Sequence, residues 1–184
     1  VALGVVLDPA LSVVAFAQSA APPQIRINAR VEGWDELSFE PRTWRCGRCD
    51  PPIMVTAQQS SVAWQAHDPP RMRAADSRAF ADMVLADSGQ RADFVENLLG
   101  HLRQRFPAHE VRATLSGRKT IGGFAFIEAQ VTLRRDSDLT SMASYTAVHK
   151  GAMIQLAAMY VVFGPRPLAV REIERFLGGV SIEE

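Results

Sequence analysis

The spacing of apolar and polar positions divides the first third of the chain into short, strand-like runs. Between residues 31 and 65, runs rich in apolar residues are separated by turn residues, and we expect strands over 34–39, 53–57 and 61–65. The segment Asp50-Pro51-Pro52 would break any regular element between the first two of these runs. This part of the chain is therefore predicted to contribute short strands joined by loops.

A helical period begins near Ala75. From there to residue 106, apolar residues recur at spacings of three and four, at Phe80, Met83, Val84, Val95, Leu98, Leu99, Leu102 and Phe106. Asp76 or Ser77 would cap the start of this helix, and Pro107 ends the pattern. Ser88-Gly89 either separates two helices or merely weakens one long helix.

The following residues alternate with a period of two, which is typical of strands with one buried face. The odd-numbered residues over 111–115 and again over 125–133 are apolar, and Gly122-Gly123 makes the turn between the two strands. A polar loop is expected over 136–140, followed by strands over 145–149 and 153–163. These segments predict a four-strand antiparallel meander.

The chain ends in a second helical pattern. Pro167 suits the first position of a helix, and the pair Gly178-Gly179 suits its end. The side chains predicted to be buried on this helix are Leu168, Ile173, Phe176 and Leu177. Because strands and helices occur in separate runs, we expect an α+β fold, an antiparallel meander with a long central helix and a C-terminal helix packed on it. Residues 31–184 would form this single domain.

Three segments give the chain a resemblance to the PsbP-like fold, which includes DcrB-like periplasmic proteins. They are the helix end at Leu102-Arg103-Gln104-Arg105-Phe106-Pro107, the hairpin at Gly122-Gly123-Phe124-Ala125-Phe126, and the Phe176-Leu177 pair of the last helix. The resemblance implies a sandwich of sheet and helices and an accessory or binding role. It carries no functional residue to this chain, and the segment with the two cysteines has no counterpart in the family pattern.

The N-terminal residues resemble an export signal. Residues 1–20 are apolar and then rich in small residues, and Ala15-Phe16-Ala17 matches the pattern that signal peptidase cleaves. No basic residue precedes the apolar run, as in a truncated signal, and the other interpretation is an ordinary core element. Residues 21–30, with Pro22-Pro23, are expected to be a linker. We therefore expect a periplasmic or secreted protein with no transmembrane segment in the mature chain, because the later uncharged run 151–165 is too short to cross a bilayer.

The charge balance narrows the possible partners. The 184 residues contain 20 Lys and Arg against 20 Asp and Glu, so the formal net charge is zero. A dedicated nucleic-acid binder carries an excess of positive charge. The composition therefore argues against a nucleic-acid partner, and the hydrophobic share of 47% is that of an ordinary globular protein.

The sharpest chemical feature is Cys46-Gly-Arg-Cys49. Such a pair is a structural disulfide or inert thiols, a redox dithiol, or part of a metal site. A redox dithiol favours a helix N-terminus, which Asp50-Pro51-Pro52 argues against, although the neighbouring arginines Arg42, Arg45 and Arg48 would favour a thiolate. Zinc needs about four ligands, of which His67 would have to be one. We expect the structural disulfide.

Other residues offer weaker chemistry. The four histidines, His67, His101, His109 and His149, form no metal-binding spacing, and there is no nucleophile or phosphate-binding motif. Residues 116–119 and Gly122-Gly123 are better explained as a hairpin turn than as an anion loop, and Glu128 as a residue of an exposed sheet face. We expect no catalytic residue, no metal and no cofactor. The predicted function is an exported, non-catalytic accessory or binding protein whose partner, a protein or a small molecule, meets a sheet face or the groove beside the long helix. The alternative is a periplasmic thiol-active protein that uses Cys46 and Cys49.

Overall fold

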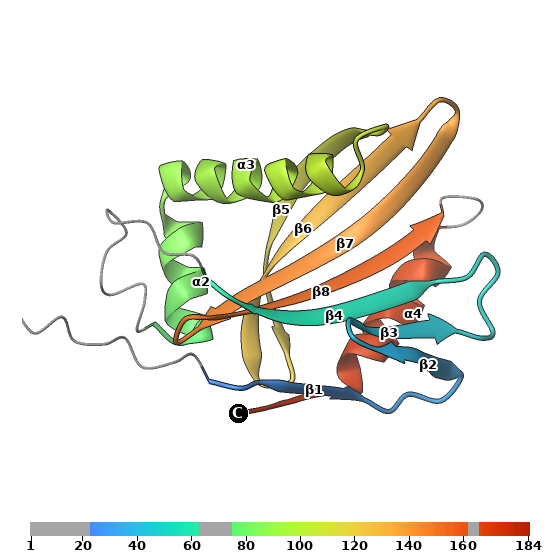
Figure 1. Cartoon of the computed structure of the whole chain (residues 1–184), viewed down its shortest axis with the longest axis horizontal. Helices are drawn as coiled ribbons and strands as arrows, with labels where there is room; N and C mark the ends of the chain where they lie inside the picture. The colour runs from blue at the N-terminus through green and yellow to red at the C-terminus, as the bar shows by residue number, and fades with distance from the viewer. Residues whose placement is uncertain (1–22, 63–74, 162–165) are drawn as a thin grey trace, which may run out of the picture.

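The computed structural model describes residues 23–62, 75–161 and 166–184, and within them the chain alternates short strands, helices and long strands (Figure 1). The helices are α2 (Ser77–Ala86), α3 (Ser88–Arg105) and α4 (Arg166–Gly178). The strands are β1 (Arg26–Ala29), β2 (Trp34–Phe39), β3 (Arg42–Cys46), β4 (Met54–Ser61), β5 (Glu110–Ile121), β6 (Phe124–Arg135), β7 (Asp138–His149), β8 (Ala152–Val161) and β9 (Val180–Glu183).

A seven-stranded antiparallel sheet organises the molecule. Its strand order is β2-β3-β4-β8-β7-β6-β5, and β1 and β9 form a separate two-stranded sheet. Strands β5 to β8 follow one another as a meander, as the alternating pattern predicts. The early strands join this meander through β4, which pairs with β8. The α+β prediction is confirmed.

Helices cover both faces of the sheet. Alternate residues of β8, among them Ile154, Leu156 and Ala158, pack with Phe176 of α4 in one core cluster. Met159, which points to the opposite face, packs with Leu98 and other residues of α3 in a second cluster. In Figure 1, α3 accordingly crosses in front of the sheet and α4 lies behind it. The strand β8 is therefore buried between two helical layers, which explains why it is apolar on both faces.

Two aspartates decide how the helical stretch is divided. Asp76 accepts a hydrogen bond from the Ala79 N–H at 2.8 Å and caps α2. Asp87 does the same for the Gln90 N–H at 2.8 Å and caps α3. Because Asp87 lies in extended backbone, the chain turns there, and the stretch forms two helices instead of one.

The structure corrects several predicted boundaries in the strands. Residues 54–61 form a single strand, and the expected strand over 61–65 falls mostly outside the described residues. Residues 116–119 continue β5 past a bulge, so the hairpin turn is limited to Gly122-Gly123. The loop expected over 136–140 is shorter, because Asp136 adopts a positive φ of 54° and lets β7 begin at Asp138.

Other corrections concern the ends of the domain. Arg26–Ala29 fall in the segment expected to be a linker, but they form β1, which pairs with β9. The strands β3 and β9 were not predicted. Leu168, expected to be buried, is 60% exposed. The signal-like residues 1–20 lie outside the described residues, and among those described no helix is both long and apolar enough to cross a membrane.

Candidate functional site

The cysteine pair lies in the connection between β3 and β4. Cys46 is the last residue of β3, and its N–H donates to the Ile53 carbonyl at 2.9 Å. The next N–H, of Gly47, donates to the Gly33 carbonyl at 2.9 Å. These bonds fold the chain back on itself, so that the Cα atoms of Cys46 and Cys49 are 5.4 Å apart and their Sγ atoms are at disulfide-bonding distance.

Aromatic residues and α4 enclose this pair. Cys46 is only 1% exposed and belongs to the core cluster that contains Trp34, Trp44 and Phe176. The Phe176 ring lies 4.5 Å from the Trp34 ring and 5.4 Å from the Trp44 ring. Cys49 is half-buried against the same cluster. The pair therefore joins the loop to the core beneath α4.

A carboxylate from α4 lies beside the two sulfurs. Glu172 places an oxygen within 4.8 Å of both sulfurs, the kind of grouping that could hold a metal ion. The same carboxylate accepts hydrogen bonds from Arg48 at 3.1 Å and Arg175 at 2.9 Å. Partial burial raises the pKa of Glu172, but the hydrogen bonds from Arg175 and Arg48 outweigh it and hold this pKa below its ordinary value.

This geometry favours a structural role for the pair. Cys46 ends a strand, so no helix N-terminus stabilises a thiolate there. Its sulfur is buried, which limits attack by another thiol. Glu172 completes an ion pair that fastens the loop to α4, and its oxygens are already engaged. His67, the residue considered as a further ligand, lies outside the described residues. The disulfide itself stays a prediction.

We predict that a Cys46→Ser/Cys49→Ser variant folds with a modestly lower stability. The loop between the cysteines is short, so the chain-entropy model gives a loss of about 2 kcal/mol. Thermal unfolding followed by circular dichroism measures the change. Disulfide exchange far faster than that of free cysteine would instead assign the pair to redox chemistry, and tightly bound zinc in freshly purified protein would assign it to a metal site.

A second prediction concerns the pH dependence of the Glu172 ion pair. Because the folded-state pKa is lowered, the stabilisation is present above the unfolded-state pKa, near the ordinary 4.5, and disappears as the pH falls through the lower folded-state value. Glu172→Gln should therefore lower the melting temperature at pH 7, and this difference should disappear once the pH has fallen below the lowered folded-state pKa. The loss is at most about 1 kcal/mol, since Arg48 is 51% exposed and solvent screens the pair.

Salt provides the control for this measurement. In about 1 M salt the gap between the two proteins at pH 7 should shrink, because ions screen a partly exposed pair. A gap that persists unchanged at low pH would show that Glu172 acts through packing and not through its charge.

Of the described histidines, His149 is the most deeply buried. His149 is 7% exposed, and its Nδ1 accepts the Ser77 N–H at 3.2 Å, while Nε2 lies 2.6 Å from Glu184. The Oγ of Ser77 accepts the Ala125 N–H of β6 at 3.1 Å. His149 therefore ties the start of α2 to the sheet. His101 is exposed on α3.

Glu128 lies beside a buried tyrosine on the α4 side of the sheet. It is directly opposite Tyr145 of β7, which is 2% exposed. Burial, together with the negative charges of Glu128 and Glu174, raises the pKa of Tyr145 above its ordinary value. The phenol is therefore neutral near pH 7, and the pair offers a hydrogen bond instead of an acid–base couple.

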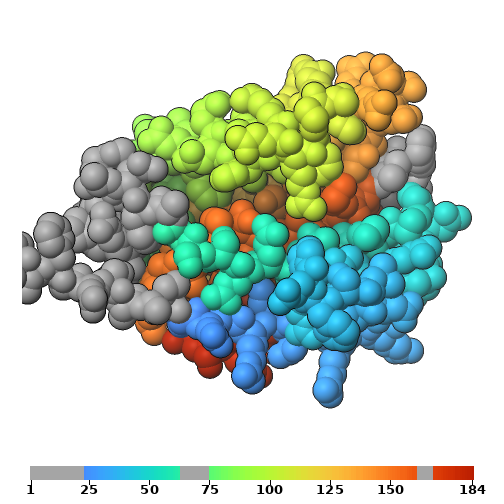
Figure 2. All heavy atoms as spheres, viewed as in Figure 1, coloured from blue at the N-terminus to red at the C-terminus, as the bar shows by residue number. Residues whose placement is uncertain are grey.

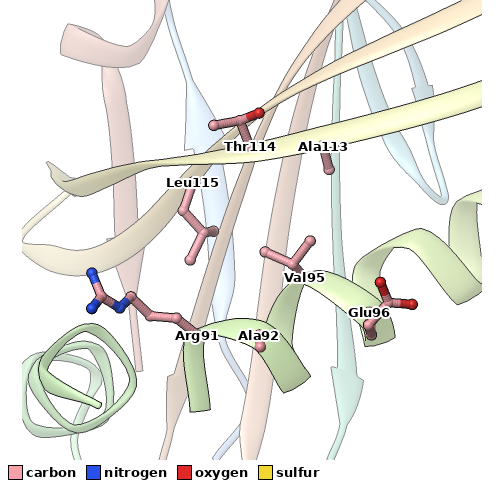
Figure 3. Close-up of a pocket in the computed structure, with 7 residues that line it drawn as sticks. All are labelled: Arg91, Ala92, Val95, Glu96, Ala113, Thr114 and Leu115. Atoms are coloured by element: carbon pink, nitrogen blue, oxygen red, sulfur yellow. The ribbon is translucent and has the colours of Figure 1, made fainter. Parts of the chain in front are cut away.

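A groove lies on the other side of the sheet, between α3 and β5. It has a volume of about 410 Å³ and is lined by Arg91, Ala92, Val95, Glu96, Ala113, Thr114 and Leu115. Figure 3 shows Val95 and Leu115 pointing into the space between helix and strand, with Arg91 and Glu96 towards opposite ends. The space-filling view shows α3 lying along the surface of the molecule (Figure 2). The groove is thus an open, mostly apolar surface with one charge of each sign.

Comparisons with known proteins support the fold only. No protein-family profile matches the chain. No curated protein matches it either. Among solved structures, LpqN of Mycobacterium tuberculosis, a protein involved in cell envelope biogenesis, is similar with a TM-score of 0.50 and 15% identity, over 90% of this chain and 87% of that chain. At this identity the similarity establishes a shared fold and transfers no residue, and the PsbP-like resemblance stays a prediction.

Proposed function

We propose that the chain is an exported, non-catalytic accessory or binding protein of the cell envelope, and that it meets its partner at the groove between α3 and β5. The observation that carries this proposal is the groove itself, an apolar surface that Ala92, Val95 and Leu115 leave open beside the long helix. Concave apolar surfaces with a few polar groups are where proteins commonly bind ligands and partners.

Three further observations support the proposal. The signal-like residues 1–20 favour export. The fold is shared with a protein involved in cell envelope biogenesis. Among the described residues, two polar groups suited to catalysis have other roles. His149 accepts a hydrogen bond that positions the start of α2, and the raised pKa of Tyr145 keeps its phenol neutral. A partner protein or a small molecule is consistent with all three.

A thiol-active function is the second candidate, and one observation favours it. Cys49 is half-buried instead of fully enclosed, and Arg48 lies next to it in sequence. A positive neighbour stabilises a thiolate. The exchange assay on the cysteine pair described above separates this function from the first.

The groove is tested by crosslinking from a defined position. A photoreactive phenylalanine analogue at Glu96, which lines the groove, should form an adduct with a partner in envelope preparations of the source organism. The same analogue at the exposed Ala108, beyond the end of α3, should not. Adding Ala92→Trp should abolish the adduct at position 96, because the indole would fill the groove. Equal adducts at the two positions would argue against the groove.

A further inference from the structure

We propose that the edge of β5 beside this groove binds an extended segment of a partner polypeptide as an additional strand of the sheet. The inference rests on the proposed function, since it names the kind of partner that the groove between α3 and β5 takes. It is carried by three features that meet at one place within the described residues: a strand edge without a partner strand, an apolar groove alongside it, and the exposed cation of Arg91.

The strand edge is the first feature. Within the described ranges, β5 pairs only with β6 and ends the seven-stranded sheet. An edge strand leaves alternate backbone N–H and C=O groups pointing away from the sheet, and an added strand satisfies them. Residues 110–115 precede the bulge of β5 and keep a regular register with 129–134 of β6. This regular half of β5 is also the part that borders the groove.

The opposite edge of the sheet is less suited to strand addition. It is formed by β2, which has six residues, and a register shift between Glu36 and Ser38 interrupts its middle. Bulges and short lengths are the features that protect sheet edges from pairing. The regular run of six residues at β5 therefore distinguishes this edge.

The side chains of β5 define what the added strand would carry. The half-buried Ala113 and Leu115 alternate with the exposed Arg112 and Thr114, and Ala113, Thr114 and Leu115 line the groove. An adjacent strand has the same alternation, so every second side chain of the partner would enter the groove. Because Ala92 and Ala113 are small, there is room for apolar side chains of medium size. The segment should alternate apolar and polar residues.

The charge of Arg91 indicates which charge a bound segment should carry at one end of the groove. Arg91 makes no ion pair with any described residue. Of the acidic groups near the groove, Glu96 pairs with Arg103, Glu110 with Arg112 and Asp82 with Arg118, while the Asp87 carboxylate, one helical turn before Arg91, accepts the Gln90 N–H. Arg91 is therefore the positive group that lines the groove at the end near Leu115, as Figure 3 shows. A carboxylate of the bound segment would complement it.

A displayed library of random twelve-residue peptides tests this inference on the full chain. The library is selected on the wild-type protein after removal of peptides that bind the Ala92→Trp variant. We expect the selected peptides to alternate apolar and polar residues and to carry an acidic residue. Synthetic copies should lose at least about tenfold in affinity for Ala92→Trp and keep it for Ala108→Trp, the matched control outside the groove.

Two modifications, one of the peptides and one of the protein, test how the segment binds. Copies with N-methyl groups on alternate backbone amides should bind at least about tenfold more weakly, because they cannot complete the ladder. Arg91→Glu should reverse the preference, favouring a copy in which the acidic residue is replaced by lysine.

Several results would overturn the inference. Selected peptides that bind equally well after N-methylation would show that no backbone ladder forms. An unchanged charge preference in Arg91→Glu would show that Arg91 does not contact the segment. A concentration-dependent dimer joined through β5 would make a second copy of the chain the occupant. If no peptide is selected while the position 96 adduct still forms, the inference fails and the proposed function stands. If neither is observed, both fail.

Discussion

Phe176→Asp is expected to leave the domain unfolded at room temperature. Phe176 is completely buried and packs against Trp34 and Trp44, so its loss removes contacts from α4, β2 and β3 together. Removing a buried phenylalanine costs about 3–5 kcal/mol, and an unpaired buried carboxylate adds to that. The total approaches the whole stability of an ordinary domain, about 5–15 kcal/mol. Circular dichroism and the dispersion of amide signals in an NMR spectrum measure the outcome.

The same helix supplies a matched control. Leu168 is 60% exposed, so Leu168→Asp should change the melting temperature little. If Phe176→Asp gave a folded protein with an unchanged melting temperature, α4 would be a peripheral element and the cysteine loop would not depend on it.

The second large effect is expected at the turn between β5 and β6. Gly122 has a φ of 55°, and a Cβ placed on it would lie 2.8 Å from Cγ1 of Ile182 in β9 and 3.0 Å from the Ile182 backbone nitrogen. The side chain would therefore force β9 to move. We expect Gly122→Ala to destabilise the fold by about 2–4 kcal/mol, from the positive φ and from overpacking together. Urea denaturation measures this loss.

Gly123→Ala separates the two causes. Gly123 also has a positive φ, of 86°, but a Cβ there would meet no atom within 4 Å. This variant should lose only the conformational part, roughly 1–2 kcal/mol. Equal losses in the two variants would show that the contact between the turn and β9 contributes nothing.

The sequence was most informative where strands are long. The meander from β5 to β8 was predicted because residues 111–115 and 125–133 alternate apolar and polar positions, because 153–163 is a long apolar run, and because Gly122-Gly123 marks a turn. Short elements gave too little pattern. β3 contains Arg42 and Arg45 among its five residues, and β1 and β9 have four residues each. These strands are held by partners distant in sequence, so local pattern did not reveal them.

The candidate site shows the same limit. The sequence singled out Cys46 and Cys49, and it suggested a groove beside the long helix as one possible surface. It gave no sign of Glu172, which comes from a helix more than a hundred residues further along the chain. Nor did it indicate which face of α3 would be left open, because the groove depends on how Val95 and Leu115 meet across two elements. Such contacts between distant residues are set by the packing of the whole domain.

The crosslink from position 96, measured with and without the cysteines, most directly decides whether the protein acts by binding a partner at the groove or through the thiols of Cys46 and Cys49. The yield of the partner adduct should be the same in the Cys46→Ser/Cys49→Ser background as in the wild type, because the pair fastens a loop on the opposite side of the sheet. It should fall to the level of the Ala108 control when Ala92→Trp fills the groove. An adduct that disappears with the cysteines but survives Ala92→Trp would contradict the account and assign the function to the thiols.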